Sequence, residues 1–255
     1  MKYTSKQISN LLKGIEDGRI NEYNLPEDLY SAIVNYLKKG VYDGFGATLN
    51  NVLEQDKELL TQLVENVHIF SGAKTYQQVK EINSLLVDEN GELVSSSEFN
   101  KLGKEKFDLW NDTWGETEYK TAIGQSQMAS KWSDIERNKD VLPNLEYSAV
   151  MDENTSDICE PLNGIIAPVD DPIWDTISPL NHFNCRCLVM QVDTEPTENY
   201  EDRAQEVEEN MQDLFKFNAG KTGEVFTKDH PYFDVPSEDK DYAKRNFDLP
   251  INLED

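Results

Sequence analysis

The chain has 255 residues, with 24 basic and 49 acidic side chains, three histidines and three cysteines. This length predicts one large domain or two small ones, each able to bury a core. The net charge of -25 argues against non-specific binding to DNA or to anionic lipid, because binding to phosphates needs clustered Lys and Arg.

No run of about 18 apolar residues is present, so we expect no membrane-spanning helix. The charged start of the chain predicts no signal peptide, and an odd number of cysteines argues against a disulfide framework. A reducing compartment is therefore expected. The acidic residues are concentrated in the second half, because residues 141–195 carry one basic and ten acidic side chains.

The first 140 residues predict a helical body. Apolar residues recur with helical spacing in residues 4–18, and a second helix is predicted over residues 25–40 with a loop at 41–51 after it. Residues 56–91 predict a long helical region that can break near Ser71–Gly72. Ser95, three residues before a glutamate, is the predicted N-cap of a further helix that runs with breaks to about Arg137.

After Pro143 the pattern changes to short apolar stretches separated by turns, which predicts short strands. These stretches are residues 145–154, 163–172 and 185–193. An acidic helix is predicted over residues 200–220, and the remainder predicts an extended tail that docks or frays. The expected fold is α+β and mainly helical, with a helical body (1–140), a small Cys/His module of short strands (141–195), and an acidic helix with an extended C-terminal tail (196–255).

Four residues of the Cys/His module have the types and the spacing of metal ligands. They follow the pattern C-x22-H-x2-C-x-C and are Cys159, His182, Cys185 and Cys187. Three thiolates and one imidazole suit a closed tetrahedral zinc site, and soft sulfur ligands favour zinc or an iron–sulfur cluster over magnesium or calcium. The module has few apolar residues, so a metal would clip it together and contribute folding free energy. Asn181 or Asn184 could support the ligands.

Two alternatives remain open from the residues alone. The cysteines can be small buried hydrophobic residues, with His182 an ordinary loop residue. One of the thiols can also be a catalytic nucleophile with His182 as its base. A disulfide between Cys185 and Cys187 would be strained and is not expected. The motifs of zinc deaminases and the complete phosphate-binding loop are missing from the sequence.

The stretch DDPIWDTISPLNHFNCRC, residues 170–187, resembles the motif of the phage Mu F-like head morphogenesis family, also called minor capsid proteins. The resemblance also covers residues 67–93, 117–132, 139–147 and 215–233. The family often has histidine where this chain has Cys159. Because Cys and His replace each other at zinc sites but not in apolar cores, this favours a metal ligand at that position. The chain has LNG where the family has LDG, and SPL where PP is usual.

The resemblance implies a phage or prophage minor head protein without enzymatic activity. It implies a role near the portal in procapsid assembly, and in DNA packaging or ejection, with portal, capsid or scaffold proteins as partners and no membrane or small-molecule substrate. The expected location is the virion, and the host cytoplasm during assembly. The charge argues against direct DNA binding. The alternatives are a metal-dependent nuclease or toxin-derived enzyme, and an acidic DNA mimic that inhibits a host protein.

Arg186 is the one basic residue of the Cys/His module. It lies between Cys185 and Cys187, so we predict that it orients this loop by pairing with a nearby carboxylate. The candidates are Asp170, Asp171 and Asp175.

Overall fold

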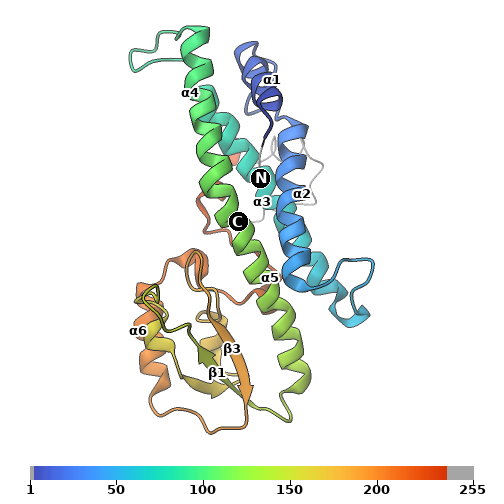
Figure 1. Ribbon diagram of the computed structural model, residues 1–255, viewed down its shortest axis with the longest axis vertical. Helices are drawn as coiled ribbons and strands as arrows, with labels where there is room; N and C mark the ends of the chain where they lie inside the picture. Colours follow the sequence, from blue (N-terminus) through green and yellow to red (C-terminus); the bar gives the residue numbers. More distant parts are fainter. Residues whose placement is uncertain (1–2, 240–255) are drawn as a thin grey trace. The chain divides into compact units, whose positions relative to one another are not determined.

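The computed structural model describes residues 3–239, without the side chain of Asp112. The chain forms two compact units, each built from separate segments of the sequence (Figure 1). Within the described residues, unit 1 comprises residues 3–37, 67–119 and 230–239, and unit 2 comprises residues 38–66 and 120–229. The predicted boundaries at residues 140 and 195 follow sequence composition and stay a prediction.

The helical body contains five long helices within the described residues, and most were predicted. They are α1 (Ser5–Glu16), α2 (Glu27–Phe45), α3 (Lys57–Ser84), α4 (Ser96–Leu109) and α5 (Gly115–Asn138). The predicted cap is confirmed, because the Ser95 side chain accepts a hydrogen bond from the backbone N–H of Glu98. α3 continues without a break through Ser71–Gly72, and the only irregularity between α4 and α5 is a π-helical turn, Trp110–Trp114. The loop predicted at residues 41–51 was placed too early, since α2 ends at Phe45.

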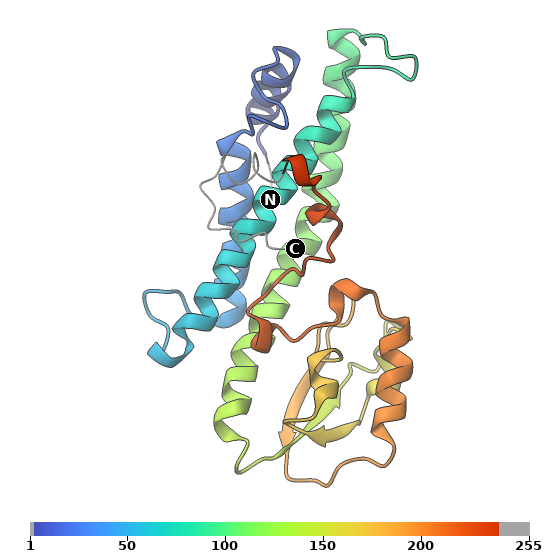
Figure 2. The same cartoon turned by 180° about the vertical axis from the view of Figure 1, so that it is seen from behind.

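Aromatic side chains and one buried ion pair hold unit 1 together. The ring of Phe107 on α4 lies 5.6 Å from that of Tyr3 and 5.0 Å from that of Trp110, both edge to face. Lys74 on α3 pairs with Glu118 at the start of α5, and both side chains are buried. Residues 230–239 pack along α3, as Figure 2 shows, and Gln77 donates hydrogen bonds to the backbone oxygens of Tyr232 and Asp234 there.

Unit 2 contains a small antiparallel sheet, which confirms the α+β, mainly helical class. Its strands are β1 (Asn144–Ser148), β2 (Ile166–Pro168) and β3 (Leu188–Val192), in the order β2-β1-β3. In Figure 1 the strands lie between the C-terminal part of α5 and α6 (Tyr200–Asn210). Trp132 and Ile135 on α5 and Val207 on α6 share one buried cluster with Tyr147 and Trp174.

That cluster corrects the expectation that the Cys/His module lacks a core. Sixteen buried residues form it, and the module contributes to it together with α5, α6 and Phe215. The predicted helix over 200–220 is shorter than expected, because α6 ends at Asn210 and only a four-residue helix, α7 (Ala219–Thr222), follows. The tail docks as far as it is described, since Asn66 accepts hydrogen bonds from the backbone of Val225 and Phe226. Residues 240–255 of the predicted tail lie outside the described residues.

None of the helices in the described part of the chain is both long and apolar enough to cross a membrane.

Candidate metal centre

Two loops of unit 2 carry the predicted metal ligands. Cys159 lies just before a 3-10 helix, Glu160–Leu162, and its backbone N–H donates to the carbonyl and hydroxyl oxygens of Ser156. His182 and Cys185 lie in the loop that leads into β3, and the N–H of Cys185 donates to the carbonyl of His182. Asn184 takes a left-handed conformation with φ of 59°, which asparagine tolerates better than most residues. This local turn brings Cys185 back towards His182.

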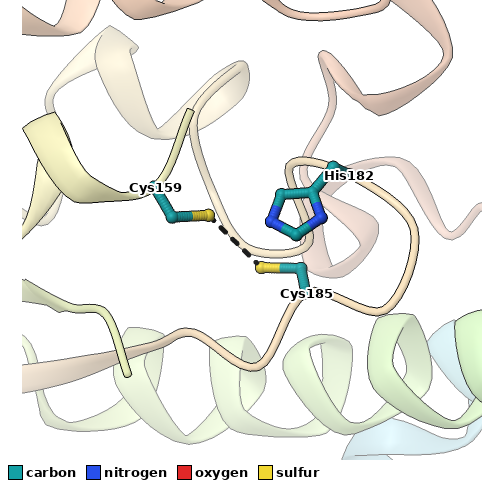
Figure 3. A group of neighbouring side chains, drawn as sticks. All are labelled: Cys159, His182 and Cys185. Atoms are coloured by element: carbon teal, nitrogen blue, oxygen red, sulfur yellow. Dashed lines mark hydrogen bonds between the residues drawn. The ribbon is translucent and has the colours of Figure 1, made fainter. Parts of the chain in front are cut away.

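The structure places three of the four predicted ligands in one group of metal-binding size. The ligand atoms of Cys159, His182 and Cys185 all lie within 4.8 Å of one another (Figure 3). The two sulfur atoms are 3.7 Å apart. Because a zinc–sulfur bond is about 2.3 Å, two sulfurs in a tetrahedron lie roughly 3.8 Å apart, whereas a disulfide would need about 2.0 Å. The spacing therefore fits two ligands of one metal ion.

His182 has the orientation expected of a metal ligand. Its Nδ1 atom lies 2.8 Å from the backbone oxygen of Phe183. A carbonyl oxygen only accepts hydrogen bonds, so Nδ1 carries the proton and Nε2 keeps a free lone pair. A ligating histidine commonly uses its second nitrogen in this way.

Cys187, the fourth predicted ligand, lies against this group but not within it. Its side chain is half-buried and packs on the cluster of Cys159, Leu180 and Cys185. The neighbouring thiol of Cys159 raises the pKa of the Cys187 thiol. Cys159, His182 and Cys185 could thus hold a metal, and the four-ligand set stays a prediction.

Hydrogen bonds within this cluster shift the pKa values of its thiols and of His182. Hydrogen bonds, first from Cys185 and then from Cys187, lower the pKa of the Cys159 thiol. The hydrogen bond between Cys185 and Cys159 raises the pKa of Cys185. A separate hydrogen bond between His182 and Cys159 raises the pKa of His182. Hydrogen bonding within the cluster therefore favours a thiolate there, the form that binds metals.

Plain burial explains only part of this arrangement. Cys159 and Cys185 are 1% and 8% exposed, as the packing alternative predicts. That alternative gives no reason for a ring nitrogen of His182 to lie within 4.8 Å of both sulfurs. The donor set of two thiols and one imidazole is the chemistry of a zinc site.

Arg186 pairs with a carboxylate, but not with one of those predicted. Its two terminal nitrogens donate to the two carboxylate oxygens of Asp152, at 2.7 and 2.6 Å. The three predicted carboxylates bind other side chains: Lys139 with Asp170, Tyr200 with Asp171 and Lys221 with Asp175. The prediction of an orienting ion pair is therefore right in kind and wrong in its partner. The pair ties the loop before Cys159 to the loop that carries Cys185 and Cys187.

Sequence reasoning missed one residue of the site. Tyr147 on β1 places its hydroxyl oxygen 3.6 Å from the sulfur of Cys159. The alternating pattern of the predicted strand gives an inward direction to this side chain, but it does not say what lies opposite.

Comparison with known proteins places the site inside a recognised region. The family described as Phage Mu protein F like protein matches residues 71–190, a segment that contains all four predicted ligands. The Mu-like prophage FluMu F protein of Haemophilus influenzae is 39% identical to this chain over 61 residues. That alignment covers 24% of this chain and 15% of the relative, so the chain spans only a small part of the relative's length. No solved structure matches. The resemblance to the Mu F-like family is confirmed for residues 71–190.

Proposed function

We propose that this chain is a minor head protein of a phage or prophage, acting without enzymatic activity in procapsid assembly near the portal. A role in DNA packaging or ejection belongs to the same proposal, as does a location in the virion. The observation that carries it is the family match over residues 71–190, which contains the motif at residues 170–187. The candidate metal ligands fall inside the matched segment.

Within this function, the cysteine and histidine residues hold a structural zinc ion. Cys159, His182 and Cys185 are three of its ligands, and Cys187 is the fourth. When bound, zinc supplies a cross-link between the two loops of unit 2 and no further chemistry. Four protein ligands leave no open position for a water molecule, which supports a structural role over a hydrolytic one.

The charge of the chain supports protein partners over DNA. The net charge is -25, and Arg186, the one basic residue of the Cys/His module, is engaged by Asp152. A nuclease needs basic groups that bind phosphates, and this module offers few. An acidic surface instead suits basic patches on portal, capsid or scaffold proteins, because opposite charges steer association.

Metal analysis tests the zinc site. We expect about one equivalent of zinc in the purified wild-type protein, and loss of that zinc in the single variants Cys159→Ser, Cys185→Ser and Cys187→Ser. His68→Gln, which changes a histidine of unit 1, is the matched control and should keep its zinc. A wild-type protein without stoichiometric metal, or serine variants that keep it, would contradict the proposed site.

Pull-down against the portal protein of the same phage or prophage tests the assembly role. We expect retention that weakens as salt rises, because screening reduces the attraction between charged surfaces. Absence of retention at low salt counts against the role. Incubation with plasmid DNA and Mg²⁺ or Zn²⁺ should leave the DNA intact. Cleavage that Cys185→Ser abolishes would favour the metal-dependent nuclease instead.

A further inference from the structure

We infer that Tyr147 and Asn181 are positioning residues of the metal centre, which deepens the proposed function and rests on it. They form a buried chain of hydrogen bonds that ends at the sulfur of Cys159. Donor and acceptor roles are fixed along this series of hydrogen bonds, and they make Tyr147 a donor to the sulfur of Cys159.

Both side chains are removed from solvent. Tyr147 is 0% exposed and Asn181 is 1% exposed. The Nδ2 atom of Asn181 lies 3.2 Å from the hydroxyl oxygen of Tyr147, and that oxygen lies 3.6 Å from the sulfur of Cys159. Tyr147 belongs to β1 and Asn181 to the loop that carries His182, so the chain connects the sheet with both ligand loops.

The backbone oxygen of Ile177 fixes the direction of the chain. The same Nδ2 atom of Asn181 lies 3.2 Å from that oxygen. A carbonyl oxygen only accepts, so the amide atom facing it is the NH2 group and not the amide oxygen. An NH2 group only donates, so the hydroxyl oxygen of Tyr147 must accept from it. The single hydroxyl proton of Tyr147 is then available for the sulfur of Cys159.

A donor at this position favours the ligand form of cysteine. Hydrogen bonds to an ionised acceptor are roughly twice as strong as neutral ones, so Tyr147 stabilises a Cys159 thiolate far more than a thiol. Three thiolates and one Zn²⁺ carry an excess negative charge, and a buried charge needs hydrogen bonds to offset its lost hydration.

The substitution Tyr147→Phe removes the hydroxyl and keeps the buried ring. Tyr200→Phe is the matched control, because the hydroxyl of Tyr200 lies in the same unit and binds Asp171 instead of a cysteine. Zinc affinity is measured by competition with a chelator on the full chain, and the sulfur-to-metal charge-transfer band is recorded with Co²⁺.

We expect Tyr147→Phe to bind zinc about 10- to 100-fold more weakly, the usual effect of losing a hydrogen bond to a ligand. The Co²⁺ band should move to lower energy, because a sulfur without its donor gives up electron density more easily. Tyr200→Phe should match the wild type in both measurements. A merely structural role for Tyr147 would not move the band.

Asn181→Ala provides a second route if Tyr147→Phe does not fold. It keeps the hydroxyl and removes the group that orients it, so a smaller loss of affinity with the same direction of band shift is expected. Equal affinity and equal band position in Tyr147→Phe and Tyr200→Phe would overturn this inference and leave the metal centre in place. A wild-type protein without stoichiometric metal would overturn both.

Discussion

Removing one partner of the buried ion pair of unit 1 should lower the free energy of unfolding by a large amount. The side chain of Lys74 is 0% exposed, that of Glu118 is 8% exposed, and the ammonium group bonds the carboxylate directly. The ring of Tyr232 lies 5.6 Å from the same ammonium group. We expect Lys74→Met, which keeps the length of the side chain and removes its charge, to leave the carboxylate of Glu118 buried without a counter-ion.

Removing one partner of a buried pair costs about 3 to 5 kcal/mol. This is a large part of the total stability of a domain, which is about 5 to 15 kcal/mol. The pair itself contributes little, because the Coulomb attraction is offset by the hydration that both groups lose. The double variant Lys74→Met, Glu118→Leu removes both charges and should therefore recover most of the loss.

Urea denaturation at pH 7, followed by circular dichroism and tryptophan fluorescence, measures these free energies. Lys57→Met is the control, because Lys57 and Glu54 form a pair that is 52% and 90% exposed and should contribute less than about 1 kcal/mol. The reasoning is refuted if Lys74→Met costs less than about 1 kcal/mol, or if the double variant is as unstable as the single one.

Four further predictions follow from particular contacts. Burial, and then the charge of Lys74, lowers the pKa of His230 to about 4. Its neutral form therefore contributes stability that is present above pH 6.5 and lost as the pH falls towards 4, by up to about 3 kcal/mol. Urea titrations between pH 4 and 7 should show this slope in the wild type and not in His230→Asn. A Cβ atom at Gly44 would lie 2.1 Å from the backbone oxygen of Ile123, so Gly44→Ala should cost about 1 to 3 kcal/mol in thermal melts. Arg186→Ala breaks an exposed pair with Asp152, so it should leave the fold intact but speed zinc release to a chelator, and an unchanged release rate would contradict its role. Chelation of zinc should increase hydrogen exchange in the two ligand loops while the amides of β1 stay protected, and loss of protection in β1 would contradict this.

The helices were predictable where their signals are local. The cap at Ser95 depends on residues within one turn of the helix, and so does the capping box at Thr4. The end of α2 was placed at the wrong glycine, because the helix runs through Gly40 and Gly44 and ends before Gly46, which takes a left-handed φ of 79°. Glycine near a predicted helix end usually indicates its stop. Gly44 instead lies inside α2, where the missing side chain lets the backbone of Ile123 approach.

The grouping of Cys159, His182 and Cys185 was predictable because their residue types are scarce. Cysteine occurs three times and histidine three times in 255 residues, so four of them within 29 positions is informative. The partner of Arg186 was not predictable, because the module holds ten carboxylates and their spacing does not say which loop faces which. The contribution of Tyr147 has the same origin, since it depends on which loops face this side chain of β1, here those of Cys159 and Asn181.

The core of unit 2 changes the role that a metal can have in this fold. A segment without its own core would depend on the metal to fold at all, as small zinc domains do. Here Trp174 and Tyr147 are 0% exposed in a core that includes Trp132 on α5 and Val207 on α6, all outside the two ligand loops. Cys159, Leu180 and Cys185 form a separate small cluster. Because apolar burial already stabilises the sheet, a metal at this cluster would fix two loops on a folded unit. Its contribution is then local order of two loops within the Mu F-like region.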